Sequence, residues 1–379
     1  METIVLLLWG SVAMIAYIFV GYPLAIWGLS KFFSMSRNTS IDINYQPTVD
    51  VILIVRNVED IIRKKIENLL ALNYSSNKLN IIIVSDQSTD NTCNLIRSIE
   101  SERITLIENN TKSSKSACLN QSIKSSKAEI LFLTDARQEI EKDCIKYLVQ
   151  HFSNNEIGAV SGELVFIDPE TNDVSKSMDA YWKYEKFIRS NESKIASVPG
   201  VTGAVYALRR QYFKPIPNET LLDDVLIPMN LVLEGKKVLF DSRAIAYDIP
   251  SDDLEREKIR KIRTLAGNWQ LLEFKPSLLL PIKNPIWLQF ISHKILRLLS
   301  PFLLLMIFIS SYMLKNNFFY SVLFFCQLAF YSVAIIATHV QVINRVPLVG
   351  IVRAFCSLMW FTFLGTYYFV SRKHLGIWK

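Results

Sequence analysis

Charged residues are distributed unevenly along the chain. Residues 4–29, 298–314, 316–344 and 354–371 contain no Asp, Glu, Lys or Arg, whereas residues 50–263 are densely charged. Each uncharged stretch approaches or exceeds the roughly 20 apolar residues that a helix needs to cross about 30 Å of hydrocarbon. The pattern predicts a membrane helix at residues 1–33, a polar domain at residues 45–250 and a membrane region of about three segments at residues 298–379.

The first apolar stretch reads as a retained anchor. A cleaved signal peptide is the alternative, but this stretch begins with Glu2, lacks a basic n-region and exceeds the usual apolar length. Lys31 and Arg37 follow it, so the positive-inside rule predicts that the polar domain lies in the cytosol of a multi-pass protein of the cell membrane.

The C-terminal apolar segments would violate the positive-inside rule if all three of them crossed the membrane. Three further crossings would place Arg372, Lys373 and Lys379 outside, so one segment is expected to lie along the membrane or re-enter it. Between the domain and these segments, residues 251–297 mix apolar runs with prolines and basic side chains. Such a composition favours interfacial amphipathic helices on the cytosolic surface.

The polar domain alternates short apolar runs with helical patterns. Strands are predicted at residues 49–55, 80–84, 104–107 and 130–134, and helices at residues 59–72, 91–99, 115–125 and 142–151. Near-continuous apolar strands separated by helices indicate an α/β domain with a mostly parallel, Rossmann-like sheet covered on both faces. Ligands then bind beyond the carboxyl ends of the strands, where Asp86 and Asp135 stand.

Composition excludes several other classes of site. The chain has neither a G-x-G-x-x-G fingerprint nor a P-loop, and its five cysteines and four histidines form no zinc pattern. The net charge of +7 is not arranged as a basic stripe with interleaved aromatics, so no nucleic-acid partner is expected. A nucleotide would have to be held by carboxylates and a lysine.

Five motifs occur in the order found in one enzyme family. They are IVSDQSTDNT at residues 83–92, KSACLN at 115–120, LTDAR at 133–137, LDD at 222–224 and RKIRT at 260–264. Together they resemble the membrane-bound family 2 glycosyltransferases with the GT-A fold, which include cellulose and hyaluronan synthases. The segment VPGVTGA at 198–204 resembles the acceptor loop of that family.

The resemblance implies a role for each matching position. Asp224 corresponds to the catalytic base, and Asp223 to the residue that orients it. The acceptor site would include Gly200, Thr202, Gly203 and Trp269. The nucleotide-sugar site would include Glu59, Asp86, Lys115, Asp135, Arg137, Arg260 and Arg263. Asp135 is also the expected ligand of a Mg²⁺ or Mn²⁺ ion.

Three positions depart from the family pattern, and one of them is Arg260, which stands where the last motif has a glutamine. Arg137 stands where the DxD motif has a second acidic or amide residue, and a guanidinium has no lone pair for a metal. Either the ion takes other ligands, or Arg137 itself neutralises the diphosphate. Thr264 stands in place of the tryptophan of the last motif, so Arg260 and Arg263 could instead belong to a basic helix on the membrane surface.

The resemblance predicts an inverting glycosyltransferase of bacterial exopolysaccharide assembly. The expected donor is a UDP-linked sugar, and the expected acceptor is a growing polysaccharide or a lipid-linked glycan. The bilayer is a partner, and other polysaccharide-assembly proteins could be partners too. A catalytically silent partner subunit and a transport protein that only senses nucleotide are the alternatives.

Overall fold

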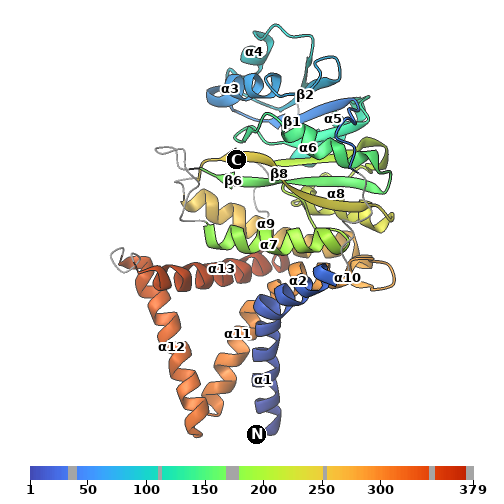
Figure 1. Cartoon of the computed structure of the whole chain (residues 1–379). Helices are drawn as coiled ribbons and strands as arrows, with labels where there is room; N and C mark the ends of the chain where they lie inside the picture. The colour runs from blue at the N-terminus through green and yellow to red at the C-terminus, as the bar shows by residue number, and fades with distance from the viewer. Residues whose placement is uncertain (33–40, 110–112, 168–178, 251–253, 341–345, 373–379) are drawn as a thin grey trace. The chain divides into compact units, whose positions relative to one another are not determined.

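The computed structural model describes residues 1–32, 41–109, 113–167, 179–250, 254–340 and 346–372 (Figure 1). Two compact units divide the chain. One contains Met1–Ala25, Asp253–Phe274 and Phe290–Leu375, and we call it the helical unit. The other contains Ile26–Asp252, Lys275–Gln289 and Gly376–Lys379, and we call it the sheet unit. The basic residues Arg37, Lys373 and Lys379 lie outside the described residues.

The described part of the sheet unit is built on an eight-stranded mixed sheet with the strand order β3-β2-β1-β4-β7-β6-β8-β5. Its strands are β1 (Val49–Val55), β2 (Leu79–Asp86), β3 (Ile104–Asn109), β4 (Ile130–Thr134), β5 (Glu139–Ile140), β6 (Ile157–Phe166), β7 (Val205–Arg209) and β8 (Lys237–Asp248). Strands β1 to β4 run parallel, β7 is antiparallel to β4 and β6, and β8 is parallel to β6 but antiparallel to β5.

Helices cover both faces of this sheet. They are α3 (Glu59–Leu70), α4 (Thr92–Arg97), α5 (Lys115–Ser125), α6 (Cys144–Val149), α7 (Asp179–Ile195) and α8 (Asp223–Leu233), with short 3₁₀ turns at Gln150–Ser153, Arg210–Tyr212 and Pro276–Leu279. Helices α3 and α6 pack on the face that carries Val51 and Leu53. Leu119 of α5 lies on the other face with Ile52 and Ile54, as the period of two along β1 requires.

The sequence predicted the parallel half of the sheet and missed the rest. The strands 49–55 and 130–134 and the helix 115–125 occur as predicted. The expectation of a mostly parallel sheet is confirmed, because four of the seven strand pairings are parallel. The sequence did not predict the three antiparallel pairings, which β7 makes with β4 and β6 and β5 makes with β8. The α/β class is confirmed, because the parallel half carries the predicted strand–helix alternation.

Four helices are long and apolar enough to cross a membrane among the described residues, by length and composition: Glu2–Phe32, Trp287–Met313, Phe318–His339 and Leu348–Val370. The first comprises α1 (Glu2–Ala16), a π-helical turn (Tyr17–Gly21) and α2 (Tyr22–Phe32). The others contain α10 (Trp287–Phe290), a second π-helical turn (Ile291–Ile295), α11 (Leu296–Met313), α12 (Phe318–His339) and α13 (Pro347–Val370). Residues 287–297, predicted to be interfacial, therefore continue into α11 as one helix.

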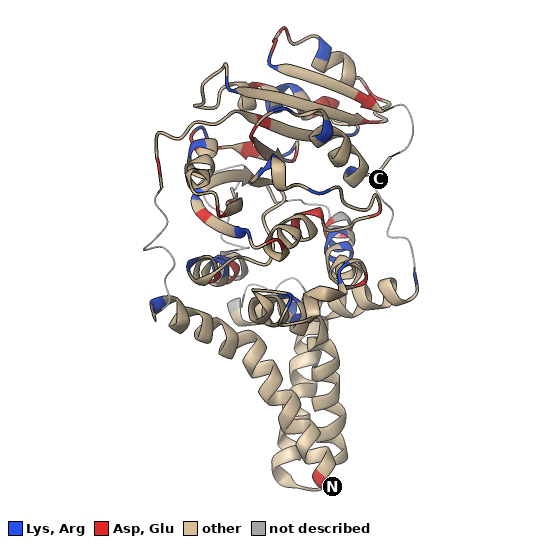
Figure 2. Cartoon of the chain, turned by 90° about the vertical axis from the view of Figure 1, so that its right-hand side faces the viewer, with Lys and Arg blue, Asp and Glu red and all other residues tan. Residues whose placement is uncertain are grey.

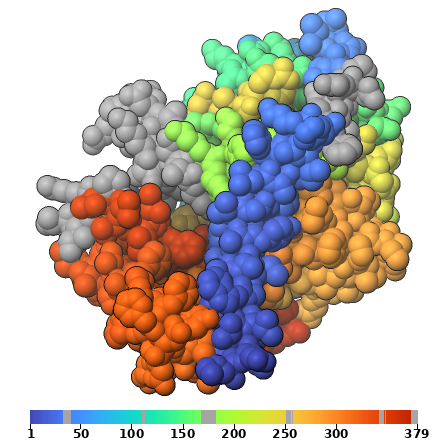
Figure 3. Space-filling view, turned by 60° about the horizontal axis from the view of Figure 1, so that its bottom comes forward, coloured from blue at the N-terminus to red at the C-terminus, as the bar shows by residue number. Residues whose placement is uncertain are grey.

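Within the helical unit, α1 lies beside α11 (Figures 1 and 3). Figure 2 shows the long apolar helices almost without charged residues. In the helical unit, many Lys, Arg and Glu residues lie on α9 (Leu254–Phe274). Helix α13 lies crosswise to α11 and α12 (Figure 1) and packs along α9 (Leu254–Phe274). The contact is close, because a Cβ added at Gly365 would lie 2.8 Å from Leu265 Cβ.

Candidate active site

Asp86 ends β2 as a completely buried carboxylate. Its Oδ1 accepts a hydrogen bond from the Ser113 backbone N–H at 3.2 Å. Its Oδ2 has no hydrogen-bond partner among the described residues. An unsatisfied buried acceptor costs about 1–3 kcal/mol, so Asp86 is prepared to accept a hydrogen bond from a ligand.

The loops after β1 and β2 are tied together by side chains. Asn57 takes a left-handed backbone (φ 50°), and its Oδ1 accepts from the Thr89 N–H at 2.8 Å. Glu59 Oε2 accepts from the Asn91 N–H at 2.8 Å. In the structure Glu59 therefore fastens the second loop to the start of α3, and its contact with a nucleotide stays a prediction.

Three charged residues meet at the carboxyl end of the parallel strands. Lys115 opens α5, whose N-cap Ser114 accepts a hydrogen bond from Ala117. Lys115 Nζ lies 3.0 Å from Asp135 Oδ1, just after β4, and 3.8 Å from Asp223 Oδ2 at the start of α8. Burial opposes the charge on Lys115, but Asp135 and Asp223 outweigh it and raise the pKa of Lys115 above its ordinary value. Lys115 is thus a permanent cation at neutral pH.

Asp135 is surrounded by cations. Burial favours its neutral form, but Lys115, and then Lys65 and Arg137, hold the pKa of Asp135 below its ordinary value. Lys65 is 3% exposed and donates to Thr134 Oγ1 at 3.1 Å and to the Gln138 carbonyl at 2.7 Å. Burial lowers the pKa of Lys65 to about 7, although Asp135 opposes that shift.

Arg137 forms an ion pair outside this cluster. Its Nη2 lies 3.1 Å from Asp248 Oδ2, which also accepts from Gln138 Nε2 at 2.7 Å. Among the described residues, no group of three or more His, Cys, Asp or Glu could hold a metal ion. The carboxylates beside Lys115, Asp135 and Asp223, therefore suit only an ion that takes its other ligands from a diphosphate and water, as Mg²⁺ usually does.

Asp224 follows Asp223 in the first turn of α8, beside the glycine-containing loop. The Val201 N–H donates to the Asp224 carbonyl at 2.9 Å. A Cβ added at Gly203 would lie 3.4 Å from Asp224 Oδ2, so this glycine keeps the space next to the carboxylate open. The structure therefore brings the predicted base and the predicted acceptor loop together.

Arg189 of α7 fixes that loop, and the sequence reasoning missed it. Its guanidinium donates to Thr202 Oγ1 at 2.9 Å, Ser161 Oγ at 3.0 Å and the Gly200 carbonyl at 3.2 Å. Burial lowers the pKa of Arg189, although carboxylates that include Glu185 and Asp224 oppose the shift. No motif pointed to this residue, because its partners lie on two segments that are separate from α7 in the sequence, β6 and the loop at residues 200–202.

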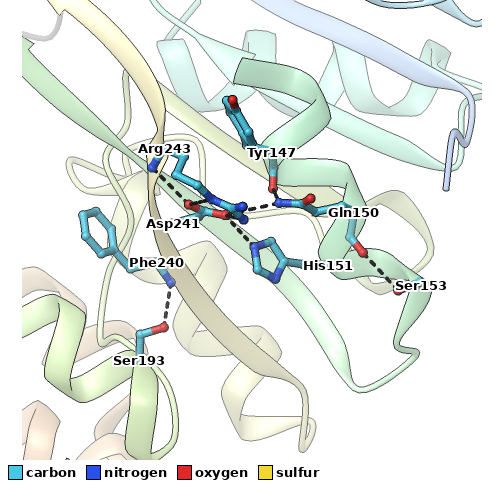
Figure 4. A network of polar contacts seen from close by, with 8 residues as sticks. All are labelled: Tyr147, Gln150, His151, Ser153, Ser193, Phe240, Asp241 and Arg243. Carbon is cyan, nitrogen blue, oxygen red and sulfur yellow. Dashed lines mark hydrogen bonds and ion pairs between the residues drawn. The ribbon is translucent and has the colours of Figure 1, made fainter. Parts of the chain in front are cut away.

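A second polar network joins α6, β8 and α7 (Figure 4). Asp241 Oδ2 lies 2.8 Å from His151 Nε2 and accepts from Arg243 Nη2 at 2.6 Å. Burial opposes ionisation, but these partners hold the pKa of Asp241 well below its ordinary value. The Phe240 N–H donates to Ser193 Oγ at 2.9 Å, so the network attaches α7, and with it Arg189, to the sheet.

Tyr206 is another residue that the sequence did not single out. It lies on β7 opposite Leu133 of β4 and is 1% exposed. Its hydroxyl has no hydrogen-bond partner among the described residues. It lines a cavity together with Ile52, Ile54, Lys115, Leu119, Leu133, Thr134, Asp135, Gly203 and Asp223.

The last predicted motif lies on α9 of the helical unit. Arg260 forms an ion pair with Glu257 at 2.5 Å, and Arg263 Nε is buried with no hydrogen-bond partner among the described residues. Trp269 Nε1 donates to Thr366 Oγ1 of α13 at 3.0 Å, and its ring stacks on Phe369. Trp269 thus packs helix against helix, and its contact with an acceptor stays a prediction.

Comparison with known proteins relates this chain to a family of glycosyltransferases. Residues 50–216 match Glycosyl transferase family 2. The beta-monoglucosyldiacylglycerol synthase of a Nostoc species is 24% identical over 60% of this chain and 49% of its own length. The poly-beta-1,6-N-acetyl-D-glucosamine synthase of Staphylococcus aureus is 22% identical over 63% of this chain and 59% of its own length. The chain thus spans about half to three fifths of these curated relatives.

A solved structure shares the fold of nearly the whole chain. It is the mannosyltransferase PcManGT of Pyrobaculum calidifontis, in complex with GDP-Man and Mn²⁺, with a TM-score of 0.73. The similarity covers 97% of this chain and 100% of that one at 19% identity. Identity this low shows a common fold.

Proposed function

Because residues 50–216 form a glycosyl transferase family 2 domain, we propose that the chain transfers a sugar from a nucleoside diphosphate sugar to a growing polysaccharide or a lipid-linked glycan. One observation carries the proposal. Lys115, Asp135 and Asp223 meet at the carboxyl ends of parallel strands, next to Asp224 and its glycine-containing loop. Parallel α/β sheets bind their ligands at this edge.

Each group in the cluster has a chemical task. The Asp224 carboxylate takes the proton from an acceptor hydroxyl as its oxygen attacks the anomeric carbon, opposite the bond to the nucleoside diphosphate. That bond breaks with its electron pair on the phosphate oxygen, which the Lys115 ammonium and the N-terminus of α5 stabilise. One base is enough, because the leaving group needs charge and no proton, and the anomeric configuration inverts.

The donor is proposed to be a uridine diphosphate sugar. The unsatisfied Oδ2 of Asp86 suits a nucleobase N–H, and a carboxylate accepts such a bond with directional selectivity. Asp135 and Asp223 would hold Mg²⁺ or Mn²⁺ together with the diphosphate. The ion would neutralise phosphate charge when bound. The PcManGT complex, which contains Mn²⁺, supports a divalent ion in this fold.

The helical unit supports an acceptor at the cytosolic membrane face. We place α13 along that surface, because its neighbour α9 carries Glu257, Lys258 and Arg260, which do not enter hydrocarbon. The helices Glu2–Phe32, Trp287–Met313 and Phe318–His339 would then cross the membrane. Three crossings return the chain to the cytosol, so that Arg372 also obeys the positive-inside rule.

The test uses the full chain in lipid nanodiscs with a panel of nucleoside diphosphate sugars and lipid-linked or oligosaccharide acceptors. We expect release of a nucleoside diphosphate that falls at least about 100-fold in Asp224→Asn. Asp143→Asn, which removes a half-buried carboxylate at the start of α6, is the matched control and should retain activity. EDTA should abolish turnover, and added Mg²⁺ or Mn²⁺ should restore it.

The alternatives give different results. A chain that binds nucleotide but turns over no donor with any acceptor is the silent partner subunit. Equal turnover by Asp224→Asn and the unsubstituted chain would refute the assignment of the base. Turnover that resists EDTA would mean that Lys115 and other cations carry the charge of the diphosphate alone.

A further inference from the structure

The cavity next to Lys115 is lined by Tyr206, a residue that belongs to none of the five motifs. Its walls are the apolar side chains of β1, β4 and α5, and its charged end carries Lys115, Asp135 and Asp223. Tyr206 and Thr134 are the polar residues that the strands contribute to its lining. Leu133 and Tyr206 are paired across β4 and β7 and project from the same face. The phenol therefore borders the cavity beside Leu133.

Within the described part of the chain, the hydroxyl of Tyr206 is an unsatisfied buried polar group. It is buried with no hydrogen-bond partner among the described residues, and a buried tyrosine hydroxyl ordinarily finds one. Burial, and then the Asp223, Asp224 and Asp135 carboxylates, raise the pKa of Tyr206 well above its ordinary value. The phenol is therefore protonated at neutral pH, offers both a donor and an acceptor, and cannot act as a base.

The size of the cavity limits what can meet this hydroxyl. Its volume is about 10 Å³, close to the space that one water-sized group occupies. This space accommodates a single hydroxyl group. Gly203 borders the same cavity without a side chain, next to the Asp224 carboxylate. The cavity therefore shares Gly203 with the surroundings of the carboxylate that we assign as the base.

We propose that this cavity is a donor-sugar subsite, in which the Tyr206 hydroxyl hydrogen-bonds one hydroxyl group of the transferred sugar. The subsite rests on the proposed transferase function and adds selectivity to it. A sugar hydroxyl would satisfy the buried phenol, whereas a sugar without that hydroxyl would leave the phenol unpaired. Sites built to hydrogen-bond a substrate hydroxyl discriminate strongly for this reason.

The experiment compares Tyr206→Phe with the unsubstituted chain in nanodiscs, using the active donor and its 2-, 3-, 4- and 6-deoxy analogues. We expect Tyr206→Phe to lower kcat/KM for the full donor by about 10- to 100-fold. The analogue that lacks the hydroxyl bound by Tyr206 should have a low kcat/KM with both proteins. For this analogue, the kcat/KM of Tyr206→Phe should lie within about twofold of that of the unsubstituted chain. The affinity for the nucleoside diphosphate alone should be unchanged, because the phenol contacts only the sugar.

Tyr74→Phe is the matched control. Tyr74 is also buried, but its hydroxyl donates to the Pro47 carbonyl at 2.6 Å, outside the cavity. Its removal should cost stability and leave the ratio of kcat/KM between full and deoxy donors unchanged. The subsite is refuted if Tyr206→Phe retains full kcat/KM, or if it loses the same factor with every analogue. Failure of the transferase proposal looks different, since the unsubstituted chain would then turn over no donor.

Discussion

Replacing Arg189 by methionine should slow sugar transfer without weakening nucleotide binding. Arg189 makes its three hydrogen bonds to the loop beside Asp224, at Gly200 and Thr202, and to Ser161 of β6. The nucleotide residues Asp86 and Lys115 receive none of them. Arg189 is a positioning residue, so its loss should change the chemical step more than the affinity for the donor.

The magnitude follows from what remains after the substitution. A hydrogen bond from a charged donor contributes about 1.5–3 kcal/mol. The loss of three such bonds is therefore the upper limit of the stability that Arg189→Met can remove. The loop keeps two other anchors, because the Thr202 N–H donates to Ser161 Oγ and the Thr202 hydroxyl to the Gly162 carbonyl, both at 2.9 Å. We therefore expect the free energy of unfolding to fall by about 2–4 kcal/mol. A displacement of the loop by about 1 Å would lower kcat about 100-fold.

The assay measures kcat, the KM of the donor and the Kd of the nucleoside diphosphate for Arg189→Met, Ser161→Ala and the double variant. Because both residues act on Thr202, their effects on kcat should be non-additive by at least about 0.5 kcal/mol. Arg209→Met is the control. Arg209 is a buried arginine of β7 that bonds the Phe152 carbonyl and Glu129, and its loss should lower stability with little further change in kcat.

Two outcomes would refute the reasoning. A kcat within about twofold of the unsubstituted value would mean that the loop holds its place without Arg189. A Kd for the nucleoside diphosphate that rises as much as kcat falls would mean that Arg189 acts through nucleotide binding. The kcat of Arg189→Lys should lie between those of Arg189→Met and the unsubstituted chain. An ammonium keeps the charge, but it lacks the planar guanidinium geometry that reaches three acceptors at once.

Three further predictions concern stability. The pKa of Lys65 is about 7 in the folded chain and about 10.4 unfolded, so the unfolded state binds more protons between these values. The melting temperature should rise with pH over this window relative to Lys65→Met, and a constant difference would contradict the shift. Asp241→Asn should cost about 3 kcal/mol at neutral pH. This difference should shrink below about pH 4, where the carboxyl of Asp241 begins to protonate in the unfolded chain but stays ionised in the folded one; unchanged thermal unfolding would contradict a stabilising role for the network. Gly162→Ala would place a Cβ 2.4 Å from the Ala244 carbonyl oxygen. It should therefore lower the free energy of unfolding by about 2 kcal/mol or more. An unchanged melting temperature would show that β6 and β8 can separate there.

The nucleotide half of the site was accessible from the sequence for a simple physical reason. Its strands are buried on both faces and read as apolar runs, so the polar residues that end them stand out. Asp86 and Asp135 were found in this way, and the structure puts them at the ends of β2 and β4. Lys65 was also readable, because it interrupts the buried stripe of α3 at the same spacing as Ile62, Ile66 and Leu69.

The remaining features depend on contacts that a local pattern does not encode. The hydroxyl of Tyr206 matters because of a cavity that three strands and a helix enclose, and nothing in residues 205–209 marks it. The bonds of Arg189 join residues 161, 200 and 202, so no spacing reveals them. The hydropathy of α13 predicts a crossing helix, whereas its packing on the charged helix α9 depends on tertiary structure.

The strand order also fixes the sequence of assembly during synthesis. Strands β1 to β4 lie within residues 49–134 and can pair as soon as that segment has left the ribosome. Strand β7 pairs with β4 only later, joining Arg209 to Ile130, and Asp224 follows it in the chain. A nascent chain can therefore complete its parallel strands, with Asp86 and Asp135 in place, before Asp224 has been made. The domain would acquire its binding edge before its base, so a nascent chain that ends before residue 224 could hold nucleotide but would lack the carboxylate assigned to the transfer.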